Sequence, residues 1–214
     1  MSKKPVRTPP LDTHDDKKRY LDEHLDNELQ WMLRAATEWF IQEQLHLCID
    51  GYSMQVYAMD STFLHARTLF EFFLHKTNKK GGNYYGVAPG FLNSPLKSNI
   101  YTKDWIGPLH SHLMHAQDRS KSRQLKSRDG LKALNEMPVY FIEEVLTLWR
   151  EFETKLEESS DAKRQELGRL ARKKREDAIK NARYVLNSEV AQCHARLKGK
   201  ILEPPSFLSD LNKH

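Results

Sequence analysis

Apolar side chains recur at every third or fourth position through long parts of this chain, and that period restricts the fold more than any other feature. A period near 3.6 residues puts apolar side chains on one face of an α-helix, whereas a half-buried strand needs strict alternation. The first such series is Leu21, Leu25, Leu29, Met32, Leu33, Ala36 and Phe40. Thr13 with Asp16 three residues later is typical of a helix start, and Gly51 interrupts the pattern. The sequence therefore predicts an amphipathic helix from Thr13 to about Asp50.

Four more helices are expected, at about 54–77, 104–119, 137–157 and 161–198. The first of these is rich in phenylalanine and is expected to be the most buried helix. The last carries charge on most of its surface and only a thin apolar seam, so it is expected to lie on the bundle or to pair with a partner. Because no segment alternates like a strand, we expect an all-α fold, namely a helical bundle with a long basic C-terminal helix.

The remaining segments complete the domain organisation. We divide the chain into a disordered arm (1–11), a helical bundle (12–158) containing a Gly- and Pro-rich loop (78–103), a long basic helix (159–198) and a loosely docked tail (199–214). The basic, polar segment 120–130 is expected to be a connector between two helices of the bundle.

Positive charge is concentrated in two parts of the chain. The formal net charge is +5, but positions 97–132 alone carry 8 Lys/Arg against 3 Asp/Glu, and positions 161–200 carry 12 against 5. Such clusters are typical of nucleic-acid contacts and equally of solvated surface. We expect no membrane span, because no stretch approaches roughly 18 consecutive apolar residues, and we expect a cytoplasmic protein because the N-terminus has no secretory signal.

Three histidines lie close together in the stretch "PLHSHLMHAQDRS" (108–120). On a helix only His112 and His115 share a face, since His110 lies about 140° from His115. Two ligands without a third on the same turn make a weak zinc site, so we expect no bound metal and no other cofactor. Imidazoles that titrate near neutral pH are better suited to proton transfer as a general base and acid.

A polar stripe crosses the phenylalanine-rich helix. Asp60, Arg67, Glu71 and His75 lie on one face of it by the period of 3.6. Buried charges need partners. The stripe is therefore either a structural network that locks two helices together, or a surface that faces His110–His115 and orients it.

The stretches "FLHARTLFEFF" and "PLHSHLMHAQDR" resemble a family of uncharacterised bacterial helical proteins with a degenerate HEPN-like motif, over about residues 55–155. The motif is an arginine, a polar residue, three further residues and a histidine. His115 matches its histidine and Ser111 its polar residue, whereas His110 stands at the arginine position. The resemblance implies a helical bundle that forms a homodimer and cleaves RNA without a metal, by attack of the 2′-hydroxyl.

The candidate roles follow from this comparison and from side-chain chemistry. We expect His115 to transfer the proton with His110 assisting, and Arg67 or Arg119 to supply a fixed positive charge. The residues expected to hold the phosphate backbone are Lys121, Arg123, Lys126 and Arg128. The same basic run is also compatible with a solvated loop.

Two functions remain open from the sequence. One is an HEPN-like metal-independent ribonuclease, or an effector derived from one, in prokaryotic stress or phage defence, with RNA and a second copy of the chain as partners. The other is a non-catalytic helical binding module, such as an adaptor or antitoxin-like partner, that has lost the catalytic arginine and engages a protein through the 161–198 helix.

Overall fold

The fold is seen in a computed structural model that describes residues 11, 13–46, 54–74, 88–98 and 122–209, with backbone alone at 54–56 and 122–138. Every regular element in these ranges is helical, and no strand occurs in them, so the all-α prediction is confirmed. The elements are α1 (His14–Tyr20), a π-helical turn (Leu21–Leu25), α2 (Asp26–Leu45), α3 (Met54–Leu74), α4 (Pro89–Leu92), α6 (Ser122–Glu157), α7 (Ala162–Leu186), α8 (Glu189–Leu197) and a 3₁₀ turn (Ser206–Leu208).

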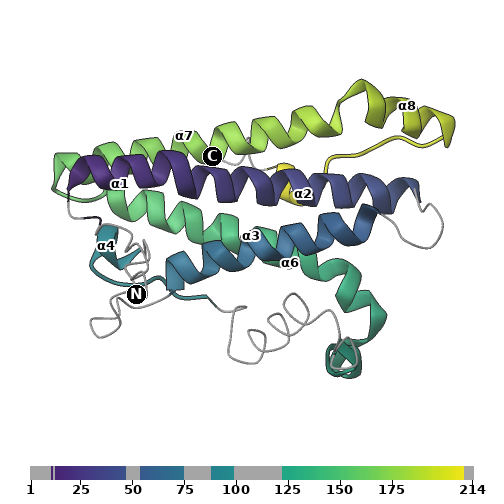
Figure 1. Ribbon diagram of the computed structural model, residues 1–214, viewed down its shortest axis with the longest axis horizontal. Coiled ribbons are helices and arrows are strands. Elements are labelled where there is room, and N and C mark those ends of the chain that lie inside the picture. Colours follow the sequence, from purple (N-terminus) through teal and green to yellow (C-terminus); the bar gives the residue numbers. More distant parts are fainter. Residues whose placement is uncertain (1–10, 12, 47–53, 75–87, 99–121, 210–214) are drawn as a thin grey trace, which may run out of the picture.

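Four long helices form the body of the molecule. α1, the π-helical turn and α2 run on as one rod, with α7 alongside it and α3 and α6 on the other side (Figure 1). α2 packs against both α3 and α7, and α6 packs against α3 and α7, so that the four helices enclose one core. α8 lies at one end of the rod and α4 at the other (Figure 1).

Aromatic side chains fill the centre of this core. Phe72 of α3 meets Phe91 and Phe152 edge-on, with ring centroids 5.7 and 5.4 Å apart. The buried Trp149 of α6 donates from Nε1 to the carbonyl oxygen of Ala171 across 2.9 Å. Edge-to-face packing suits aromatic quadrupoles, and the buried indole N–H is satisfied. These contacts tie α3, α4, α6 and α7 together.

The N-terminal cap has the geometry that the sequence predicts. Asp16 donates its backbone N–H to the Thr13 hydroxyl oxygen at 3.1 Å, and the Asp16 carboxylate accepts from the Thr13 backbone. The helix ends at Leu45, where His46 takes a left-handed conformation with φ of 50°, and residues 47–53 lie outside the described part. The π-helical turn was not predicted; its Leu21 and Leu25 both face the core.

Three predictions about the second half of the chain are wrong. α6 begins at Ser122, so that most of the expected connector 120–130 is helical. The expected single helix 161–198 is broken, because Asn187 ends α7 and the Ser188 hydroxyl accepts from the Ala191 N–H to start α8. The described part of the tail, residues 199–209, is not loosely docked, because Leu202, Phe207 and Leu208 are buried.

The rest of the predicted organisation lies outside the described residues. This applies to residues 1–10 of the expected arm, to the helix at 104–119 and to all of the loop 78–103 except 88–98. Among the helices described, none is long and apolar enough to cross a membrane.

Candidate functional site

The structure describes only some of the residues that the sequence predicts to be catalytic or to bind RNA. His110, His115, Arg119 and Lys121 lie outside the described residues, and so does His112. Arg123, Lys126 and Arg128 lie in the N-terminal part of α6, where the backbone alone is described. Arg67 is the candidate whose side chain can be placed.

Arg67 is engaged within its own helix. Its Nε donates to Glu71 Oε1 at 2.9 Å, and its side chain is only 18% exposed. The link between helices comes instead from His65, whose Nδ1 lies 2.8 Å from Glu28 Oε2 of α2. The Arg67–Glu71 pair lies within α3, so it does not confirm the interpretation of the stripe as a network that locks two helices together, and that interpretation did not include His65. The alternative, a stripe facing His110–His115, falls on undescribed residues.

Three basic residues of α7 form ion pairs with carboxylates of neighbouring helices. Arg175 pairs with Glu153 in the interior, Arg172 pairs with Glu157, and Lys174 pairs with two aspartates of the N-terminal rod. Of these pairs, the one at Lys174 joins α7 to the N-terminal rod, whereas Arg172 and Arg175 pair with glutamates of α6. Part of the positive charge of positions 161–200 therefore stabilises the fold.

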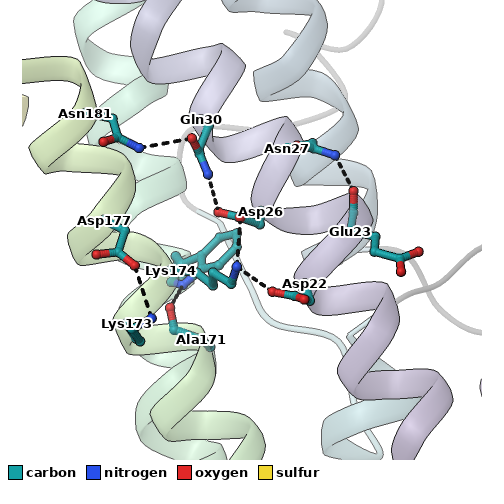
Figure 2. A network of polar contacts seen from close by, with 11 residues as sticks. Asp22, Glu23, Asp26, Asn27, Gln30, Ala171, Lys173, Lys174, Asp177 and Asn181 are labelled. Atoms are coloured by element: carbon teal, nitrogen blue, oxygen red, sulfur yellow. Dashed lines mark hydrogen bonds and ion pairs between the residues drawn. The ribbon is translucent and has the colours of Figure 1, made fainter.

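The pairs around Lys174 continue as a chain of polar contacts from the π-helical turn to α7 (Figure 2). Lys174 Nζ contacts Asp22 and lies 3.0 Å from Asp26 Oδ2. Gln30 Nε2 donates to Asp26 Oδ1 at 3.0 Å, and Asn181 Nδ2 donates to Gln30 Oε1 at 3.2 Å. Burial would lower the pKa of Lys174, but its hydrogen bonds to Asp22 and Asp26 outweigh burial and raise it. The hydrogen bond from Lys174 lowers the pKa of Asp22.

The series of polar contacts from Asp22 to Asn181 ends at a groove of about 720 Å³ between α2, α7 and α8. Two large aromatic side chains on its walls are open to solvent, Trp31 of α2 at 52% and Tyr184 of α7 at 79%. The guanidinium of Arg34 lies 5.6 Å from the Trp31 ring centroid, within cation–π range. Asn27, Gln30 and Asn181 also line the groove. Its volume is typical of sites that bind small molecules or single residues of a polymer.

The sequence predictions did not find this groove. Trp31 lies on the opposite side of α2 from the buried Leu29 and Leu33, and a tryptophan on the polar face of an amphipathic helix was the available signal. Tyr184 lies among the charged residues of α7 in the same way. Trp31 and Tyr184 line one groove because α2 packs against α7, and no local sequence pattern reveals this packing between distant parts of the chain.

The described residues contain no group of three or more His, Cys, Asp or Glu side chains that could hold a metal ion. Comparison of the chain with protein-family models, curated proteins and solved structures found no match. The functional proposal therefore rests on the chemistry of the chain's own residues.

Proposed function

We propose that this chain binds RNA and is an HEPN-like metal-independent ribonuclease, or an effector derived from one. The observation that carries the proposal is the position of basic residues at the start of α6. This helix runs from Ser122 to Glu157, and its first turn contains no acidic residue. Arg123, Lys126 and Arg128 lie near its N-terminus.

A basic cluster is electrostatically unfavourable at this end of a helix. The helix dipole places partial positive charge at the N-terminus, so acidic residues are favoured there and basic ones are not. An anion relieves the repulsion, and free backbone N–H groups at a helix start bind phosphate. The C-terminal half of the same helix, from Phe141 to Leu156, is anchored in the core. The basic residues thus lie on the N-terminal part of a helix whose C-terminal half belongs to the core.

Cleavage would use the histidines that precede this helix. His115 takes the proton from the ribose 2′-hydroxyl and His110 protonates the leaving oxygen, or the two exchange these roles. A cation beside the phosphate stabilises the charge that develops there. Arg67 is already paired with Glu71, so Arg119 is the better candidate for this role.

The test is RNA cleavage by the purified chain in the presence and absence of EDTA, across a range of pH. We expect cleavage that survives EDTA, a bell-shaped pH–rate profile, and loss of activity in His115→Ala but not in His112→Ala. Loss with EDTA, together with equal damage from both substitutions, would indicate a metal site. RNA binding that weakens with salt, without cleavage by the wild type, would favour the non-catalytic binding module.

A further inference from the structure

We propose that the groove between α2, α7 and α8 binds an unstacked nucleobase of single-stranded RNA, and that it prefers bases carrying an amino group, such as cytosine and adenine, over uracil. The inference rests on the proposed RNA binding but not on cleavage. It assigns a role to residues distant in sequence from the histidine segment.

Exposed aromatic rings supply the stacking surface. Trp31 and Tyr184 are large apolar side chains that line one groove and remain half or more exposed. Bases of single-stranded RNA stack on such rings irrespective of sequence, and arginine adds a cation–π contribution. Arg34 already lies over Trp31. Lys180 is exposed one helical turn before Tyr184 and can meet the backbone phosphate.

The hydrogen-bonding preference follows from the polar chain that ends at the groove. The Asp26 carboxylate only accepts, so Gln30 must turn its amide nitrogen toward it. The carbonyl oxygen of Gln30 then faces the Asn181 amide nitrogen. The carbonyl oxygen of Asn181 accepts no hydrogen bond from the other residues drawn in Figure 2 and stays available as an acceptor.

Further acceptors on the same walls strengthen this preference. Asn27 donates its amide nitrogen to the carbonyl oxygen of Glu23, which leaves its own carbonyl oxygen as an acceptor. Glu38 brings a carboxylate to the groove. Donors also line the groove, at Arg34, Ser188 and His194, so the preference rests on the acceptor oxygens of Asn27, Glu38 and Asn181, which a ligand with N–H donors can satisfy. Cytosine and adenine present an exocyclic amino group, and carboxylates accept from cytosine N4.

An apolar protein helix fits this groove less well. Its side chains would cover the amide oxygens of Asn27 and Asn181 without donating to them, and an unsatisfied buried acceptor is costly. A nucleobase satisfies both requirements, because its faces stack and its edge donates.

Binding can be measured separately from cleavage with 2′-O-methyl RNA, which has no 2′-hydroxyl to attack. We would titrate the full chain against fluorescein-labelled C5, A5 and U5 oligonucleotides in low salt and follow fluorescence anisotropy. We expect C5 and A5 to bind about 10-fold more tightly than U5. Tyr184→Ala should weaken C5 binding by about 5- to 100-fold, whereas Tyr184→Phe keeps the ring and should bind like the wild type.

The matched control is Tyr140→Ala, which removes a tyrosine of α6 that is also exposed, at 52%, but does not line the groove. It should leave C5 binding unchanged. Asn181→Leu, which removes the acceptor while keeping the size of the side chain, should reduce the preference for C5 over U5. Circular dichroism melts of all variants confirm that each one is folded.

Three outcomes would overturn the inference. If Tyr184→Ala binds C5 like the wild type while Arg123→Glu with Lys126→Glu does not, RNA binding stands and the groove has no part in it. If Tyr184→Ala leaves RNA binding unchanged but changes the molar mass in solution, the groove is an interface between copies of the chain. If the wild type binds none of the three oligonucleotides, both the inference and the proposed function fail.

Discussion

Arg175 of α7 and Glu153 of α6 form a two-pronged ion pair in the interior of the bundle, with Nη2–Oε1 and Nε–Oε2 distances of 2.8 and 3.2 Å. Both residues are buried, at 6% and 3% exposed. Burial raises the pKa of Glu153, although the hydrogen bond from Arg175 opposes that shift. Arg150 lies nearby, and its pKa is lowered by burial and by repulsion from Arg175.

Removing one member of this pair should be costly, because the other charge then stays buried without compensation. We expect Glu153→Gln to lower the free energy of unfolding by about 3–5 kcal/mol, and Arg175→Met to lower it by less, since only Glu153→Gln leaves two arginines close together. Urea unfolding followed by circular dichroism measures both.

The control is the exposed pair Lys173–Asp177, for which Lys173→Ala should change the free energy of unfolding by less than about 1 kcal/mol. The double variant Glu153→Gln with Arg175→Met should lose less than the sum of the two single losses. Strict additivity would mean that the two side chains do not stabilise each other.

The pair Asp22–Lys174 should make stability depend on pH in the acid range. The hydrogen bond from Lys174 lowers the pKa of Asp22 below its ordinary value of 3.8. A lowered carboxyl pKa contributes stability that is present above pH 3.8 and is lost as the pH falls through the lowered value. The pKa of Lys174 is raised above 10.5, so its contribution to the stability of the fold is present below pH 10.5 and is lost only as the pH rises above that value.

Thermal melts between pH 3 and 7 test this dependence. Asp22→Asn should melt at a lower temperature than the wild type at pH 7, and the difference should shrink as the pH approaches 3. Glu23→Gln is the matched control in the same π-helical turn, because the Glu23 side chain makes no ion pair in the described part of the chain. A constant difference between Asp22→Asn and the wild type at every pH would contradict the assignment.

The sequence predicts contacts between residues one helical turn apart better than it predicts contacts between residues that are far apart in the chain. The Thr13–Asp16 cap was found because both partners lie within one turn. The helix break at Ser188 also had a local signal, because serine is a common helix N-cap. It was missed because the apolar series of the expected helix continues through Val190. The start of α6 was missed because Ser127, Asp129 and Gly130 suggest a connector, although they lie within a helix whose later turns are held by the core.

The candidate site divides in the same way. The Arg67–Glu71 pair follows from helical spacing, whereas the contacts Asp26–Lys174 and Gln30–Asn181 join helices that are far apart in the sequence. The composition shows only that positions 1–50 are acidic, with 10 Asp/Glu against 7 Lys/Arg, and that positions 161–200 are basic. It could not show that they pair with each other, because pairing depends on which faces of α2 and α7 meet.

α7 approaches α6 closely at Gly168, and alanine there should be destabilising. A Cβ atom would lie 2.6 Å from Glu157 Cγ, 2.9 Å from the Glu157 backbone nitrogen and 3.0 Å from the Glu153 carbonyl oxygen. Because two of these atoms belong to the backbone, α7 would have to move away from α6, which costs about 1–3 kcal/mol. Alanine is favoured over glycine in a helix by up to about 1 kcal/mol, so we expect Gly168→Ala to lose on the order of 1–2 kcal/mol net.

Gly90→Ala provides the comparison, because a Cβ atom at Gly90 of α4 would meet no atom within 4 Å. There the reduced freedom of the unfolded chain should dominate and raise the free energy of unfolding by about 0.5–1 kcal/mol. Urea unfolding of the two variants beside the wild type gives both values. If Gly168→Ala were as stable as Gly90→Ala, the gap between α6 and α7 would be wide enough for a methyl group. The close packing that excludes water from the Glu153–Arg175 pair would then be absent.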